Sequence, residues 1–117
     1  MQYACLIYDP VDSPPPSPEE KQQVFGEYMK FSEDVQKAGV IRGGAPLQPT
    51  DTATTVRVRK GERLTTDGPF AETKEWLAGF YLLECNNLDE ALAWAAKIPG
   101  AKYGSIEVRP LLDIPGM

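Results

Sequence analysis

The sequence predicts an α+β fold in which four buried strands are combined with two helices and one hairpin. Three observations support this class. Short apolar runs, bounded by Pro, Gly, Asn or Asp, recur along the chain at the length of strands. Two other segments repeat apolar residues every three or four positions, which is typical of amphipathic helices. Residues 54–66 alternate apolar and basic or polar residues, as a hairpin with one solvated face does.

The N-terminal part contains the first strand and the first helix. Residues 2–8, QYACLIY, form an apolar run that stops at Asp9-Pro10, which predicts a buried strand. After a proline-rich loop, Ser17 is expected to cap a helix whose first residue is Pro18. We expect this helix to end at Gly39, because glycine readily adopts the left-handed conformation of a helix C-terminus. The apolar stripe of the helix contains Val24, Tyr28, Phe31 and Val35.

A second strand and a hairpin follow. Residues 40–47, VIRGGAPL, predict a strand, and the Gly43-Gly44 pair indicates a bulge or a close approach of two backbones. In residues 54–66 the valines share one face and the arginines the other, with a turn at Lys60-Gly61. This pattern predicts a hairpin with one wet face.

The C-terminal part supplies the remaining elements. Residues 74–85, KEWLAGFYLLEC, predict a long strand that is apolar on both faces. Strict alternation puts Trp76, Ala78, Phe80 and Leu82 on one face, and Leu77, Gly79, Tyr81 and Leu83 on the other. A second helix is expected to begin after Asn87 and to end at Pro99-Gly100. Residues 103–110, YGSIEVRP, predict the last strand.

This order is the split βαβ arrangement of a ferredoxin-like domain with an inserted hairpin, and residues 1–117 suit a single domain. Two helices cover only one face of a four-stranded sheet of this size. Yet the first strand and the strand of residues 74–85 are apolar on both faces. A second copy of the chain, packed sheet to sheet, is the simplest cover for the other face. We therefore predict a homodimer.

The composition restricts the chemistry of the chain. Its net charge of −5 has the wrong sign for a nucleic-acid-binding protein. No apolar run approaches the roughly 20 residues of a membrane helix, and the N-terminus lacks the basic segment of a signal peptide, so we expect a cytoplasmic protein. Histidine is absent, which removes the commonest general base and the commonest transition-metal ligand. Without a cysteine cluster or a phosphate-binding glycine motif after a strand, we expect no metal and no organic cofactor.

The two cysteines, Cys5 and Cys85, lie among apolar residues in predicted strands. They are either two small core residues or a reactive pair. Because there is no CxxC spacing and no histidine to activate a thiol, the sequence favours the core.

Six segments carry a resemblance to a known family. They are YACLIY, LQPTDTATTVRVR, TDGPFAETKE, GFYLLEC, DEALAWAAKIP and YGSIEVRP, in this order between Tyr3 and Pro110. In this combination the chain closely resembles the DGPF subgroup of the YCII-related proteins. The resemblance implies a dimeric α/β barrel built on the ferredoxin-like unit. It also implies relatives that act on cyclic or aromatic metabolites, some with a His–Asp dyad that this chain cannot carry, and an association with extracytoplasmic-function sigma factors.

The stretch TDGPFAETKE, residues 66–75, has two interpretations. In the first it is a rigid turn, in which Gly68 adopts a conformation that other residues resist and Phe70 anchors the turn in the core. In the second it borders a cleft between the sheet and its partner, where Asp67 and Glu72 are candidate proton acceptors. Side chains from other strands would complete this ligand site: Tyr8 and Tyr81 to orient a ring, and Arg42 and Lys74 to receive an anion.

The basic hairpin also has two interpretations. Its positive charges either discourage edge-to-edge pairing of an exposed hairpin or form a docking surface for an acidic protein partner. For the whole chain three functions stay open: a lyase, isomerase or hydrolase acting on an organic anion, a ligand-binding protein that reports to a transcription regulator, and an interaction protein without a ligand. The prediction adopted is binding of a small, anionic organic molecule in the cleft at the dimer interface, with carboxylate acid/base chemistry. A non-enzymatic regulatory protein linked to a sigma factor system is the alternative.

Overall fold

The computed structural model describes residues 1–12, 14–69 and 74–116. In chain order the elements are β1 (Gln2–Pro10), α1 (Pro18–Ala38), β2 (Ile41–Pro46), η1 (Thr50–Thr52), β3 (Thr54–Arg59), β4 (Glu62–Asp67), β5 (Glu75–Glu84), α2 (Leu88–Ala95), η2 (Pro99–Lys102) and β6 (Ser105–Pro110). None of the helices in these ranges is long and apolar enough to cross a membrane.

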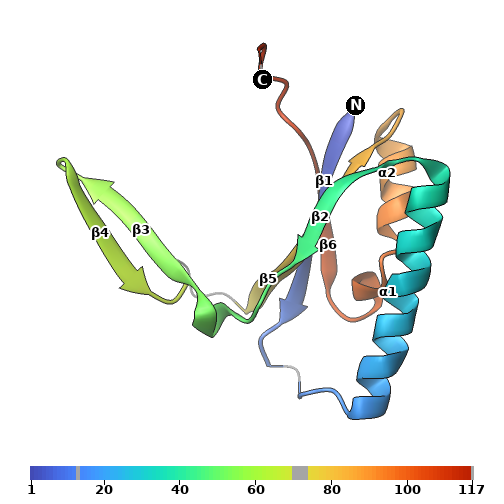
Figure 1. Cartoon of the computed structure of the whole chain (residues 1–117), viewed down its shortest axis with the longest axis horizontal. Coiled ribbons are helices and arrows are strands. Elements are labelled where there is room, and N and C mark those ends of the chain that lie inside the picture. Colours follow the sequence, from blue (N-terminus) through green and yellow to red (C-terminus); the bar gives the residue numbers. More distant parts are fainter. Residues whose placement is uncertain (13, 70–73, 117) are drawn as a thin grey trace.

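Four of the strands form one antiparallel sheet in the order β2-β5-β1-β6. Both helices lie on the same face of this sheet (Figure 1). This is the ferredoxin-like arrangement that the order of elements predicts, with β3 and β4 inserted between β2 and β5 as a separate pair. The fold class expected from the sequence is confirmed.

Local side-chain chemistry explains where the helices begin and end. The hydroxyl of Ser17 accepts a hydrogen bond from the backbone N–H of Glu20 at 3.1 Å, and Pro18 is the first residue of α1. Gly39 ends the helix with a φ of 71°. The side chain of Asn87 caps α2 in the same way, accepting from the Glu90 N–H at 2.9 Å. The signals expected at Ser17, Gly39 and Asn87 are confirmed. The expected end of the second helix at Pro99-Gly100 is wrong: α2 ends at Ala95, and Pro99 begins the separate 3-10 helix η2, because proline cannot donate a hydrogen bond to the turn before it.

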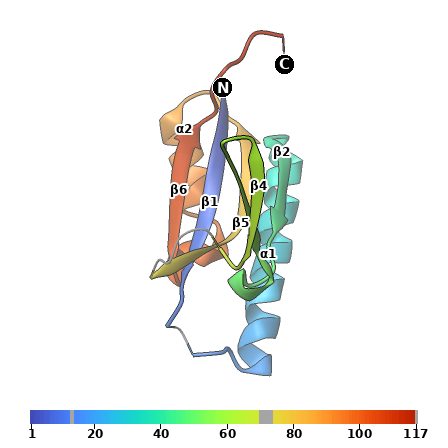
Figure 2. The ribbon, with the colours of Figure 1, turned by 90° about the vertical axis from the view of Figure 1, so that its left-hand side faces the viewer.

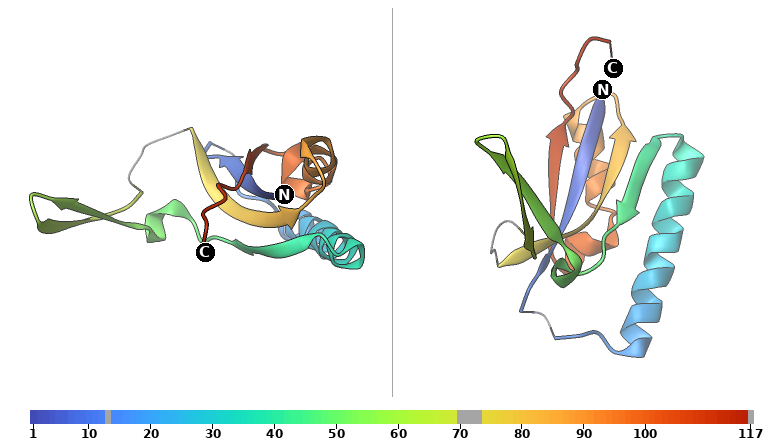
Figure 3. Two further views of the ribbon diagram at one scale, coloured as in Figure 1. Left: turned by 90° about the horizontal axis from the view of Figure 1, so that it is seen from above. Right: turned by 60° about the vertical axis from the view of Figure 1, so that its left-hand side comes forward.

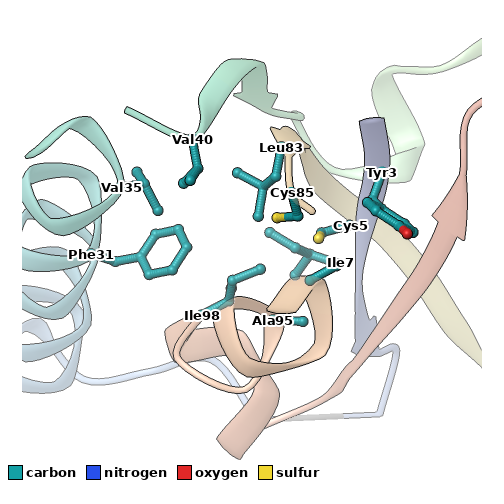
Figure 4. Packing of buried hydrophobic residues seen from close by; sticks show 11 residues of the cluster. Tyr3, Cys5, Ile7, Phe31, Val35, Val40, Leu83, Cys85, Ala95 and Ile98 are labelled. Carbon is teal, nitrogen blue, oxygen red and sulfur yellow. The ribbon is translucent and has the colours of Figure 1, made fainter. Parts of the chain in front are cut away.

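The core lies between the helices and the face of the sheet that they cover (Figure 4). Its members are Tyr3, Cys5, Ile7, Phe31, Val35, Val40, Leu83, Cys85, Ala91, Ala95 and Ile98. Both cysteines are free and buried, and burial raises the pKa of the Cys5 thiol to about 11. A buried thiol that stays protonated is a poor nucleophile, so these residues pack the core, as the sequence favours.

No helix of the described residues lies on the opposite side of the sheet, and we call this side the open face. Alternation along β1 puts Ala4, Leu6 and Tyr8 there, opposite their cross-strand neighbours Leu82, Phe80 and Leu77 of β5. All six side chains are partly exposed. The open face is therefore mainly apolar, as the pattern of the two strands predicts.

A β-bulge separates two halves of the β1–β5 pair. Ile7 lies opposite Gly79 but Tyr8 lies opposite Leu77, so Ala78 has no partner in β1. Beyond the bulge Trp76 lies opposite Asp9. The strict alternation expected for residues 74–85 is therefore wrong at this end, and Trp76 joins Tyr81 on the helix side of the sheet.

A second irregularity falls where the Gly43-Gly44 pair predicts one. The register of β2 on β5 shifts between Ile41 and Gly43. A Cβ atom on Gly44 would lie only 2.5 Å from the carbonyl oxygen of Phe80, so the two backbones approach closely there.

The hairpin of β3 and β4, residues 54–67, stands away from the rest of the molecule, and we call it the arm. In Figure 1 it projects from the side of the sheet opposite the helices, and in Figure 2 it lies in front of the open face. The radius of gyration is 16.4 Å, against about 13 Å for a compact chain of this length. The arm is thus not packed into the domain that carries it.

Candidate ligand-binding cleft

A cleft of about 690 Å³ lies between the N-terminal half of α1 and the sheet. Its origin is the way α1 packs. The buried side chains of this 21-residue helix are Phe31 and Val35, both in its C-terminal half. The N-terminal half therefore stands off the sheet and leaves a space of the size that small-molecule sites have.

Most of the lining is apolar. Val24 and Phe25 come from α1, Pro46 and Leu47 from the end of β2 and the residue after it, and Trp76 and Ala78 from β5. Polar side chains interrupt this surface, and those of the described residues are Asp9, Lys21, Tyr28, Ser32 and Tyr81. An apolar cleft with a few polar groups is the usual form of a site for a small organic ligand.

Among the described residues, Asp9 is the one acidic residue of this lining. Because of the bulge in β5, Asp9 lies opposite Trp76, and Gly104, between η2 and β6, lies beside Asp9. A Cβ atom on Gly104 would collide with the carbonyl oxygen of Tyr8 and lie 3.2 Å from the Asp9 carboxylate, so only glycine permits this approach. Burial raises the pKa of Asp9 above its ordinary value, because the charged form loses contact with water.

The two tyrosines bring hydroxyl groups to the same cleft. The Tyr28 hydroxyl accepts a hydrogen bond from the Gly100 N–H at 3.1 Å, which leaves its own proton available to a group in the cleft. Burial raises the pKa of Tyr28 to about 12, and the charge of Asp9 contributes to the shift. Tyr81 packs its ring against Phe31, with centroids 5.1 Å apart.

Tyr81 is also held through its hydroxyl group, which is hydrogen-bonded to Ser32, while burial raises its pKa. Both phenols are therefore neutral near pH 7 and act as hydrogen-bond donors. Together with a carboxyl group whose pKa is raised, they can bind an oxygen atom of a ligand and exchange a proton with it. Lys21 adds a positive charge to the lining.

Of the six side chains that the sequence proposes for a ligand site, Tyr81 lines this cleft. Tyr8 belongs to the open face. The guanidinium of Arg42 donates hydrogen bonds to the carbonyl oxygens of Gly39 and Ile41 at 2.8 and 3.0 Å, which closes the turn between α1 and β2. Asp67 ends β4 on the arm and Lys74 is exposed before β5, while Glu72 lies outside the described residues. The cleft lies on the helix side of the sheet, whereas the sequence predicts a cleft between the sheet and that of a second copy.

The described part of the TDGPF stretch acts as a turn. Gly68 has a φ of 98°, which favours glycine. Its N–H donates to the Ala53 carbonyl at 2.7 Å, and its own carbonyl accepts from the Thr55 hydroxyl at 2.8 Å. These bonds fasten the end of the arm to its beginning. Phe70, the predicted anchor, lies outside the described residues.

Sequence reasoning does not select Asp9, Tyr28 or Trp76 as site residues. In the sequence, Asp9 marks the end of a strand and Tyr28 belongs to the apolar stripe of α1. The bulge that places Trp76 on the helix side depends on the pairing of two strands, so the pattern of one strand does not predict it. One signal is present in the sequence. Lys21, Tyr28 and Ser32 recur at helical spacing on one side of the first helix, which gives a nominally buried face an unusual number of polar groups.

Metal binding finds no support in the described ranges, where no three His, Cys, Asp or Glu side chains are placed to hold an ion together. The polar groups of the cleft, a carboxyl group with phenols and an apolar wall, suit an organic ligand instead.

Comparisons with known proteins agree with the fold. Residues 1–115 match the model of the YCII-related domain. An uncharacterised protein, R00369, of Rhizobium meliloti (strain 1021) is 44% identical over 114 residues, which cover 95% of this chain and 92% of that protein. A solved structure of 5-chloro-2-hydroxyhydroquinone dehydrochlorinase (TftG) from Burkholderia phenoliruptrix AC1100, in complex with 2,5-dihydroxybenzoquinone, aligns with a TM-score of 0.54 and 16% identity. The alignment covers 96% of this chain and 94% of that one.

Proposed function

Since the chain belongs to the YCII-related domain family, we propose that it binds a small hydroxylated ring compound in the cleft beside α1, and that Asp9 exchanges a proton with the bound ring. The observation that carries this proposal is the environment of Asp9: a carboxyl group with a raised pKa, in an apolar cleft that also holds two neutral tyrosines. General acids and bases that work near neutral pH are tuned in this way.

Each group of the cleft has a role in this proposal. The apolar wall, with Trp76 and Phe25, contacts the faces of the ring. The hydroxyl groups of Tyr28 and Tyr81 donate hydrogen bonds to a ring oxygen, and Lys21 attracts an anionic substituent of the ring. These contacts orient the ring so that one of its protons faces Asp9.

The chemistry is a proton transfer. The ionised carboxylate of Asp9 takes the proton of a ring hydroxyl group and returns it to a ring carbon, which converts the enol form of the ring to its keto form. If the carbon that receives the proton also carries an anionic leaving group, elimination follows: Asp9 takes the proton of a second, conjugated ring hydroxyl group, and the electron pair of that O–H bond moves through the ring to expel the leaving group as an anion. The class of reaction is thus isomerase or lyase. The hydroxylated quinone bound by the structural neighbour is a ligand of this kind, although an identity of 16% supports the fold alone.

Ligand binding tests this proposal directly. The probe is 2,5-dihydroxybenzoquinone, and its binding is measured by isothermal titration and by thermal shift. At one hundred times its Kd a ligand adds about 2.7 kcal/mol of stability, which a thermal shift resolves easily. We expect Asp9→Asn to abolish turnover of such rings and to weaken binding, and Asp113→Asn, the same change in the exposed C-terminal segment, to alter neither.

The variant Asp67→Asn separates the cleft from the loop that the sequence favours. We expect it to bind and turn over the probe as the unmodified protein does. Loss of binding in Asp67→Asn with retention in Asp9→Asn would refute the assignment of the cleft. If no hydroxylated ring compound in a tested series shifts the melting temperature of the unmodified protein or of either variant, the proposed ligand class is refuted as well.

We also propose that two copies pair through the open face. Its apolar side chains from β1 and β5 are only partly buried within one copy, and packing of a second sheet is the ordinary way to remove such a surface from water. The association with an extracytoplasmic-function sigma factor system stays a prediction of the family resemblance.

A further inference from the structure

The arm presents apolar side chains that are about half or more exposed within its own copy. Val56, Val58 and Leu64 are 57%, 61% and 45% exposed. The strands β3 and β4 pair with each other and with no other described strand. An isolated two-stranded hairpin is at best marginally stable in water, so an arm of this length requires a surface to rest on.

The charge of the arm indicates what kind of surface that is. Residues 54–67 contain four basic and two acidic side chains, whereas the rest of the chain contains eight basic and fifteen acidic ones. The arm is thus positive and the body that carries it is strongly negative. A second copy of the chain offers the arm an acidic body, and two arms that lay against each other would repel.

The position of the arm makes this contact reachable. It projects on the side of the sheet that carries the open face, in front of β1 and β5 when the molecule is viewed from that side (Figures 2 and 3). A copy seated on the open face therefore lies next to the arm. Because a two-fold dimer repeats every contact, each copy would hold the other with its own arm.

One polar group at the end of the sheet also lacks a partner. The Oε2 atom of Glu84, the last residue of β5, is buried and accepts no hydrogen bond from the described residues, while its Oε1 atom lies 3.7 Å from the N-terminal amino group. Glu84 pairs with Gln2 in the row next to Ala4 and Leu82 of the open face. A cationic side chain from a second copy would satisfy this oxygen.

We propose that the arm is a dimerisation arm: in a dimer formed through the open faces, the basic, apolar hairpin of each copy docks on the acidic body of the other. The inference rests on the pairing of two copies and does not depend on the identity of any ligand. In this proposal the acidic partner of the hairpin is a second copy of the same chain and not a different protein.

A short-arm variant provides the first test. Val56 and Thr65 lie directly opposite each other, so Arg57–Leu64 can be replaced by the dipeptide Asn-Gly, which closes a two-residue hairpin between them. The replacement leaves the bonds of Gly68 to Ala53 and Thr55 in place. In analytical ultracentrifugation we expect the unmodified chain to be a dimer and the short-arm variant to dissociate at least tenfold more readily.

A charge variant keeps the full arm. Arg57→Glu/Arg63→Glu changes two basic side chains of the arm, and Lys30→Glu/Lys37→Glu makes the same change of net charge on α1. Circular dichroism confirms that each variant is folded. We expect at least a tenfold rise of the dimer dissociation constant for the arm variant, no comparable rise for the α1 variant, and weaker association of the unmodified dimer as salt is added.

Other results would overturn the proposal. A monomeric unmodified chain, or a dimer that both arm variants leave equally tight, would show that the arm does not dock on a second copy; an acidic protein partner would then be the alternative to examine. Binding of 2,5-dihydroxybenzoquinone by the short-arm variant distinguishes this failure from failure of the proposed function, because the cleft is lined by residues of a single copy outside the arm.

Discussion

The two faces of the sheet differ in how completely one copy of the chain covers them. On the helix side, Leu83 has no exposed surface and the core includes side chains from β1, both helices and the segments that follow them. On the open face, the neighbouring residue Leu82 is only partly buried. The same strand therefore contributes to one surface that is complete within the protomer and to one that is not.

The helix side itself is complete at one end only. The C-terminal half of α1 buries Phe31 and Val35, whereas its N-terminal half borders the cleft. The proposed ligand site and the proposed dimer surface thus arise from the same cause, which is apolar surface that the secondary-structure elements leave uncovered. They differ in polarity: the cleft holds Asp9 and two tyrosines, and the open face is mainly apolar. A polar lining indicates a small ligand, and an apolar face indicates a second protein surface.

The largest expected effect comes from truncating the two neighbouring leucines of β5. Leu83→Ala creates a cavity in the core and should lower the free energy of unfolding by about 2–5 kcal/mol at any protein concentration. Leu82→Ala should cost less than Leu83→Ala in dilute solution, because Leu82 is only partly buried within one copy. At concentrations that favour the dimer it should cost more, because the substitution removes apolar contact between the copies.

Urea denaturation at two protein concentrations a hundredfold apart measures this difference. The unmodified chain should gain stability with concentration, and Leu82→Ala should gain less. Equal losses of unfolding free energy for the two variants at both concentrations would contradict the view that one face is covered within a single copy and the other is not. Concentration-independent stability of the unmodified chain would contradict the dimer.

Much of the fold follows from local sequence signals. The caps Ser17 and Asn87 and the terminator Gly39 lie where the sequence predicts them, because each acts through bonds within its own turn. The bulge near Gly43 follows from a glycine pair for the same reason. Two helices can cover only one face of a sheet whose strands are apolar on both sides, and this comparison correctly predicts an apolar face without a helix above it.

The candidate site is less visible in the sequence because it depends on how distant segments are placed. The bulge at Ala78 is a property of the pairing of β1 with β5, so alternation within β5 does not predict that Trp76 faces the helix side. The cleft exists because half of α1 stands off the sheet, and no local pattern gives that distance. Among the described residues, Tyr81 alone is common to the predicted site and the observed cleft. It follows the bulge in the chain, in the part of β5 where the pairing with β1 is regular, so simple alternation gives its side of the sheet correctly.

The second prediction compares the two halves of α1. Ser17→Ala removes the N-cap of the half that borders the cleft, and should lower the free energy of unfolding by about 1 kcal/mol. Because few buried contacts hold this half, the loss should appear as local fraying. Hydrogen exchange should speed up at the amides near Glu20 and stay unchanged near Val35. Equal changes in both halves would contradict the view that the first half depends on its cap.

The smallest expected effect on stability comes from Asp9, and its direction follows from its pKa. Burial raises the pKa of this carboxyl group above its ordinary value of 3.8, so the folded chain binds the proton more tightly than the unfolded chain does. Stability from this group is fully present below pH 3.8 and is lost as the pH rises through the pKa in the folded state. Asp9→Asn cannot ionise, and should be more stable than the unmodified chain at neutral pH while losing its activity.

The matched variant Asp113→Asn, in the exposed C-terminal segment, should reproduce the pH dependence of the unmodified chain. Thermal unfolding between pH 3 and 8 gives the difference between the two variants. A gain for Asp9→Asn that grows with pH would mean that the cleft keeps a carboxyl group at a cost in stability, as sites that need a tuned proton carrier do. If Asp9→Asn is instead less stable than the unmodified chain at neutral pH, the carboxylate stabilises the fold. Asp9 would then not be the proton carrier of the cleft.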